Sequence, residues 1–160
     1  MNNINYLMKH LGLGELLAEP VPVSGGLLHK MYRVTTAKGG FAVKVLNPEI
    51  MKRPEALRNT IFSEKIANAL SEEISLIAAV EYAGNQIHEW QGYYYMFFPW
   101  LEGTSVFPPN ITVNHCEAVG TLLGKMHAKK LQVEGVLPET EVGIMYPWEE
   151  YLELAETKDL

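Results

Sequence analysis

Short apolar runs separated by turn residues dominate the N-terminal part of the chain, a pattern typical of β-strands. The strongest run is Phe41–Leu46, which follows a glycine pair at residues 39 and 40 that favours a turn. A short meander of three further runs comes later in the chain. The predicted extended segments are Val21–Ser24, Met31–Thr36, Phe41–Leu46, Ser75–Glu81, Gln86–Trp90 and Tyr93–Phe98.

Other segments place apolar residues at helical spacing. The first of them begins near the N-terminus, and we expect Pro20 and Pro22 to end it. The second is entered through Pro54, because proline is favoured at the first position of a helix. The predicted helices are residues 2–18, the segment that starts at Pro54, Thr112–Lys130, and the opening of another at Pro147–Glu156.

The order of these elements predicts an α+β fold. Three strands, one main helix and a meander precede a linker rich in glycine and proline, and a helical region follows. This is the layout of a protein-kinase-like N-lobe, a five-stranded antiparallel sheet with one main helix, followed by a hinge and the first helices of a truncated C-lobe. We predict an N-lobe at residues 1–98, a hinge or linker at 99–110, and an incomplete helical C-lobe at 111–160.

Composition places the chain among ordinary globular proteins. Of its 160 residues, 48% are hydrophobic and 20% are charged. No apolar run approaches the roughly 18 residues that span a bilayer, and the N-terminus lacks the pattern of a secretory signal. The one cysteine, Cys116, excludes an internal disulfide. These features predict a cytoplasmic protein with no membrane partner.

Charge is distributed unevenly. The net charge of −6 disfavours nucleic acid as a partner. Residues 1–70 hold 9 Lys and Arg against 5 Glu, or +4, whereas residues 71–160 hold 4 Lys against 14 Asp and Glu, or −10. A basic half could hold polyphosphate while an acidic half meets a cationic substrate. Surface charge that falls unevenly without any function explains the same counts.

Lys44 lies inside an otherwise apolar predicted strand. With the period of 2 it shares a face with Ala42 and Leu46, and burial of a lone ammonium is costly. One interpretation is an edge-strand lysine that reaches water. The other is a lysine that holds phosphates and is steadied by a carboxylate on the neighbouring helix. Glu64 is the best-placed carboxylate, although it could instead be an exposed partner of a nearby lysine.

Gly25 and Gly26 separate the first two predicted strands. Paired glycines let backbone amides approach an anion closely, but a glycine pair between strands is also a simple turn. The chain has no full G-x-G-x-x-G and no lysine-serine pair of a P-loop, so the motifs of those nucleotide sites are missing.

Several motifs share the order and spacing of a known family. They are Ser24-Gly25-Gly26, Met31-Tyr32-Arg33-Val34, Phe41-Ala42-Val43-Lys44, Glu64, Met96-Phe97-Phe98-Pro99-Trp100-Leu101-Glu102-Gly103 and Val119–His127. Together they resemble the aminoglycoside phosphotransferase and choline kinase superfamily over about residues 20–130. The resemblance implies ATP as the cofactor and a small-molecule hydroxyl as the phosphate acceptor.

The resemblance also implies how the phosphates are bound. Gly25 and Gly26 would lie over them, Lys44 would bind them, and Glu64 would orient Lys44. His29 stands where the family often has asparagine.

For the adenine, the resemblance implies four further positions. Ala42 would roof the ring and Phe98 would occupy the gatekeeper position. The Pro99 carbonyl would accept a hydrogen bond from the adenine amino group, and the Leu101 amide would donate one to a ring nitrogen. Proline suits position 99 because only its carbonyl is required.

The family completes its site with His-x-Asp-x-x-x-x-Asn and a later acidic residue that binds Mg²⁺. The one aspartate here is Asp159, and none of the five histidines begins His-x-Asp. We therefore expect no catalytic and no metal-binding residue in these 160 residues, and Mg²⁺ only with the missing C-lobe. The segment Glu149–Leu160 has no helix stop, which favours a fragment over a natural short form.

These inferences predict the ATP-binding portion of a small-molecule phosphotransferase that is inactive alone. The acceptor would be aminoglycoside-like or choline-like, and the acidic second half favours a cationic one. The alternative is a nucleotide-binding pseudokinase, or a regulatory or assembly module without catalysis. We also expect the apolar stripe of Thr112–Lys130 to favour a homodimer or an exchange of elements between two copies.

Overall fold

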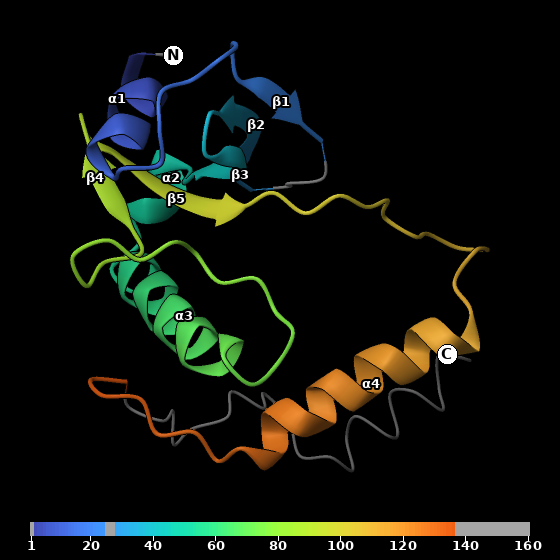
Figure 1. Cartoon of the computed structure of the whole chain (residues 1–160). Coiled ribbons are helices and arrows are strands. Elements are labelled where there is room, and N and C mark those ends of the chain that lie inside the picture. The colour runs from blue at the N-terminus through green and yellow to red at the C-terminus, as the bar shows by residue number, and fades with distance from the viewer. Residues whose placement is uncertain (1, 25–27, 137–160) are drawn as a thin grey trace, which may run out of the picture.

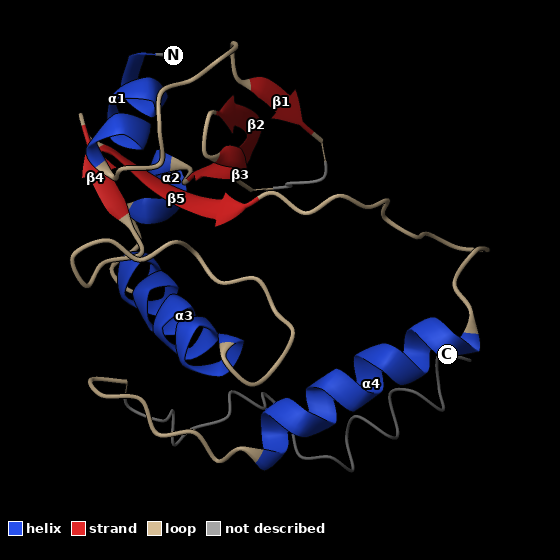
Figure 2. Cartoon of the chain, in the orientation of Figure 1, coloured by secondary structure: helices blue, strands red, loops and turns tan. Residues whose placement is uncertain are grey.

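The computed structural model describes residues 2–24 and 28–136. One sheet and four helices make up the described chain, and Figure 2 separates the two kinds of element. In chain order they are α1 (Asn2–His10), β1 (Val21–Val23), β2 (Lys30–Thr36), β3 (Gly39–Val45), α2 (Pro48–Met51), α3 (Ala56–Ser71), β4 (His88–Trp90), β5 (Tyr93–Pro99) and α4 (Val113–Ala128).

The sheet has five strands in the order β1-β2-β3-β5-β4, and every neighbouring pair is antiparallel. Figure 1 shows α1 on one side of the sheet and α3 on the other. The predicted fold class, α+β with a five-stranded antiparallel sheet and one main helix, is confirmed. No helix in residues 2–24 and 28–136 is long and apolar enough to cross a membrane.

We call the face of the sheet that α1 covers the outer face; it carries Tyr32, Val34, Phe41, Val43, Val45, Tyr95 and Phe97. The predicted apolar stripe of α1 packs against this face and forms the main core. The stripe consists of Ile4, Leu7, Met8 and Leu11.

The predicted extension of the first helix to residue 18 is wrong. The helix ends at His10, and Gly12 and Gly14 follow with φ angles of +68° and +98°. These angles belong to the left-handed region, which glycine adopts without strain. A Cβ at Gly14 would also lie 3.1 Å from the Cβ of Thr36, so the close approach of this turn to β2 requires glycine.

The predicted strand Ser75–Glu81 is also wrong, because the segment forms no strand. The carboxylate Oε2 of Glu64 accepts the Ala79 N–H at 3.1 Å, and the Asn68 side-chain amide donates to the Ala79 carbonyl at 3.3 Å. One bond, from Val80 N–H to the Phe97 carbonyl at 2.7 Å, ties the segment to β5. Two side chains of α3 thus take the backbone groups of Ala79 that a ladder would use.

Helix α4 follows an extended segment, residues 100–112, and stands apart from the sheet (Figure 1). Thr112 caps it through a capping box with His115. Its stripe is exposed, with 57% of Val119 and 48% of Leu123 accessible to solvent. A homodimer on this stripe stays a prediction, and the predicted helix Pro147–Glu156 lies outside the described residues.

His88 on β4 is a half-buried histidine beside the ring of Phe97. Its Nε2 is buried and has no hydrogen-bond partner within the described ranges. Burial lowers the pKa of His88 below the ordinary 6.5, and the nearby His10 lowers it further, while a hydrogen bond with the Val80 backbone opposes both. The folded state therefore disfavours the protonated ring.

We expect the melting temperature to fall as the pH drops from about 8 to about 5, because the unfolded chain takes up this proton first. The stability is complete above pH 6.5, the unfolded value, and is lost as the pH falls from there toward the folded pKa. His88→Phe should flatten the slope, whereas His127→Phe on exposed α4 should not. Equal slopes in wild type and His88→Phe would contradict this assignment.

Candidate functional site

The face of the sheet opposite α1 carries the residue that the sequence singled out. In the register of β2, β3 and β5, Lys44 lies opposite Met31 on one side and Met96 on the other. We call this the inner face; it is formed by Met31, Arg33, Ala42, Lys44, Met96 and Phe98. The predicted sharing of a face by Ala42 and Lys44 is confirmed.

Lys44 is half-buried between the two methionines and forms no ion pair with any residue that the structure describes. The pKa of His29 is lowered, mainly by burial and also by the positive charge of Lys44. The His29 Nδ1 accepts the backbone N–H of Asn47 at 3.0 Å, which requires an unprotonated nitrogen. A cation among apolar side chains without a described counter-charge is suited to bind an anion.

Glu64 does not pair with Lys44 among the described ion pairs. Its carboxylate instead accepts the backbone N–H of Ala79. Glu64 thus binds the backbone N–H of Ala79 and Asn68 binds its carbonyl, and the two bonds tie the segment around Ala79 to α3. The role of Glu64 toward Lys44 stays a prediction.

The hinge begins where β5 ends at Pro99. The Trp100 N–H donates to the Gly40 carbonyl at 3.0 Å, so residue 100 turns its backbone groups toward β3. Because consecutive residues of a strand point their groups to opposite edges, the Pro99 carbonyl and the Leu101 N–H point away from β3. Strand β4 pairs only with Tyr93–Tyr95 and does not extend along β5 as far as Pro99.

The Pro99 carbonyl and Leu101 N–H therefore face an open edge, and neither has a hydrogen-bond partner in the described part of the chain. Pro99 and Leu101 border a hollow of about 520 Å³, whose wall also includes Ala79 and Val80. Phe98 is half-buried on the inner face opposite Ala42. A planar group with one donor and one acceptor could bind along this edge.

A polar cluster at the hinge was not predicted as part of the site. The Arg33 guanidinium lies 2.8 Å from the Glu102 carboxylate and 4.5 Å from the centre of the Trp100 ring. The Trp100 indole N–H donates to the same carboxylate at 3.1 Å. Alternation within β2 puts Arg33 on the face of Met31, but only the register with β3 shows that this is the face of Ala42 and Lys44.

Two of the predicted phosphate-binding positions, Gly25 and Gly26, lie outside the described residues. Within the described ranges, no group of three or more His, Cys, Asp or Glu could hold a metal ion. The structure thus brings Ala42, Lys44 and Phe98 onto one face, with Pro99 and Leu101 at its edge.

A five-stranded antiparallel sheet, a lysine on the inner face of β3, a main helix after β3 and a hinge after β5 define a protein-kinase-like N-lobe. Residues 19–144 match the sequence profile of the phosphotransferase enzyme family (APH). The chain belongs to this family.

Individual relatives match only part of the chain in sequence. Stress response kinase A of Escherichia coli strain K12 is 32% identical over 87 residues, which are 54% of this chain and 25% of that protein. Stress response kinase A of Shigella flexneri matches with the same values. The chain spans about a quarter of the length of these curated relatives. Among solved structures, the PknI kinase domain of Mycobacterium tuberculosis is similar, with a TM-score of 0.44 and 14% identity over 70% of this chain and 45% of that one.

Proposed function

We propose that this chain binds ATP on the inner face of its sheet and forms the nucleotide-binding part of a small-molecule kinase. The observation that carries the proposal is Lys44, a half-buried ammonium between Met31 and Met96 with no counter-charge among the described residues. Membership of a phosphotransferase family supports the same reaction, the transfer of the γ-phosphate of ATP to a hydroxyl group.

In this proposal Lys44 binds the phosphates, as a positive charge in an apolar setting is suited to do. Ala42 and Phe98 contact the adenine from the sheet. The Pro99 carbonyl and the Leu101 N–H, both open in the described structure, take the adenine amino group and a ring nitrogen. Gly25 and Gly26 cover the phosphates.

The transfer step needs groups beyond these. Phosphoryl transfer requires a carboxylate at the acceptor hydroxyl and Mg²⁺ to offset the developing charge. The one aspartate of the chain, Asp159, lies outside the described residues. We propose that a longer polypeptide supplies the catalytic and Mg²⁺-binding residues and most of the acceptor pocket. The acidic second half favours a cationic acceptor.

Calorimetric titration tests the proposal most simply. We expect the chain to bind ATP in a saturable manner and at least about tenfold more tightly than adenosine, because only ATP reaches Lys44. Equal affinities for ATP and adenosine would contradict the phosphate role, and no binding of either would overturn the proposal.

Glu64→Gln separates two roles of the same side chain. Glutamine still offers an oxygen to the Ala79 N–H, so we expect an unchanged melting temperature. If the charge of Glu64 helps to orient Lys44 once nucleotide is bound, ATP affinity should fall several-fold. Glu72→Gln, an exposed carboxylate at the end of α3, is the matched control. Unchanged ATP affinity in Glu64→Gln would confine Glu64 to holding Ala79.

A further inference from the structure

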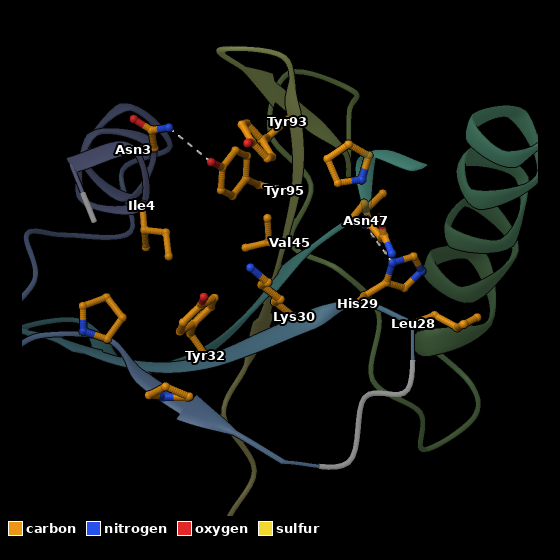
Figure 3. Close-up of a pocket in the computed structure, with 14 residues that line it drawn as sticks. Asn3, Ile4, Leu28, His29, Lys30, Tyr32, Val45, Asn47, Tyr93 and Tyr95 are labelled. Atoms are coloured by element: carbon orange, nitrogen blue, oxygen red, sulfur yellow. Dashed lines mark hydrogen bonds between the residues drawn. The ribbon is translucent and has the colours of Figure 1, made fainter. Parts of the chain in front are cut away.

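A second concave surface lies on the outer face of the sheet, on the side opposite Lys44. Helix α1 covers only part of this face, and the uncovered part opens into a cavity of about 990 Å³ (Figure 3). Strands β2, β3 and β5 and the first turn of α1 all contribute to its wall. Its wall includes Ile4, Lys30, Tyr32, Val45, Tyr93 and Tyr95.

Three tyrosine rings and two aliphatic side chains form the apolar part of the lining, which also includes Asn3, His29, Lys30 and Asn47. Tyr95 is 4% exposed, and its hydroxyl accepts a hydrogen bond from the Asn3 side-chain amide at 3.4 Å (Figure 3). The hydroxyl hydrogen of Tyr95 is thus still able to donate. Tyrosine rings offer large apolar faces and a polar tip, which suits a planar aromatic ligand.

The ionisable side chains of the lining other than its tyrosines are basic. Lys30 lies opposite Val45 in the register of β2 and β3, and Figure 3 shows its side chain between Val45 and Tyr32. The lining contains no Asp or Glu, and Lys30 has no ion pair with any described residue. The other basic lining residue, His29, uses its Nδ1 to accept the Asn47 N–H. Most of the lining comes from the first 48 residues, within the half of the chain that carries a net charge of +4.

We propose that this cavity binds a small aromatic carboxylate. The ring lies against Tyr32 and Val45, and the carboxylate meets the ammonium of Lys30. The volume falls within the roughly 300–1,000 Å³ of small-molecule sites, which are mostly apolar with a few convergent polar groups. One lysine matches the charge of one carboxylate.

The site is separate from the proposed nucleotide site. Lys44 and Val45 are neighbours in the sequence, but the alternation of β3 points them to opposite faces of the sheet. A ligand in the outer cavity and a nucleotide on the inner face therefore do not compete for space. Binding at the two sites also depends on different residues: Lys30 in the outer cavity and Lys44 on the inner face.

Titration of the chain with 1-naphthoate tests the inference, with and without saturating ATP. We expect saturable binding that ATP does not displace, and weaker binding of the neutral analogue 1-naphthalenemethanol. Lys30→Met, which keeps the length of the side chain and removes its charge, should weaken 1-naphthoate binding at least about tenfold. Lys125→Met makes the same charge change on exposed α4 and should leave the affinity unchanged.

Tyr32→Leu provides a second variant that removes a ring and keeps the charge, and it should also weaken 1-naphthoate. Melting temperatures of all variants show whether each is folded; Lys30 is exposed, so its variant should melt as the wild type does. Absence of saturable binding by the wild type would overturn the inference. So would equal affinities in Lys30→Met and Lys125→Met, or displacement of 1-naphthoate by ATP, which would assign the ligand to the inner face.

Discussion

Lys44→Ala is expected to weaken ATP binding at least tenfold, a loss of about 1.4 kcal/mol or more. The residue is half-buried on the inner face, with Met31 and Met96 on either side. A charge in such a setting interacts with phosphate more strongly than one surrounded by water, because the local dielectric is lower. Removal of the ammonium leaves the phosphates without their proposed partner on the sheet.

Lys125→Ala removes the same charge from exposed α4 and controls for the change in net charge. It should bind ATP as the wild type does. Calorimetry with both variants and a thermal melt of each are sufficient. If Lys44→Ala is folded and binds ATP with wild-type affinity, the phosphates do not lie on the inner face beside Lys44.

Phe97→Ala is expected to cost about 3–5 kcal/mol of unfolding free energy. Phe97 is 0% exposed and lies on β5, opposite Val43, in the core beneath α1. Truncation removes the buried ring and leaves a cavity that the sheet cannot fill by moving. Since whole domains are stable by about 5–15 kcal/mol, a loss of this size removes a large share of the stability.

Urea denaturation followed by circular dichroism measures this loss. Phe107→Ala is the matched control, because Phe107 is 69% exposed in the segment between β5 and α4. Its midpoint should be that of the wild type. A midpoint for Phe97→Ala equal to that of Phe107→Ala would show that the contact between α1 and the outer face does not form the core of this chain.

The strands that carry the site were predictable because their signal is local. Period-2 alternation within β3 assigned Ala42 and Lys44 to one face, and the register with β2 and β5 confirms it. The segment Ser75–Glu81 has an equally apolar run but forms no strand. Glu64 and Asn68, which precede it on α3, form hydrogen bonds with the N–H and the carbonyl of Ala79 that a strand would use for pairing. No pattern within the run itself reveals that competition.

The hinge shows the same limit for the site. Pro99 and Leu101 could be named from their motif, and the structure leaves their backbone groups open. The cluster of Arg33, Trp100 and Glu102 joins residues 69 positions apart, so only the folded sheet brings it together. An exposed pair of this kind contributes at most about 1 kcal/mol to stability, which makes it a feature of the hinge rather than of the core.

The outer cavity could not be predicted from the sequence at all. Its lining combines the first turn of α1 with residues of β2, β3 and β5, which are up to about 90 positions apart in the sequence, so only the folded chain brings them together.

The central claim is that nucleotide binds on the inner face, and methionine methyl NMR tests it most directly. Met31 and Met96 flank Lys44 there, while Met8 is buried under the outer face and serves as an internal control. Addition of ATP to the methyl-labelled chain should shift the signals of Met31 and Met96 and leave that of Met8 unchanged. Signals of Met31 and Met96 that do not move at saturating ATP would contradict the account.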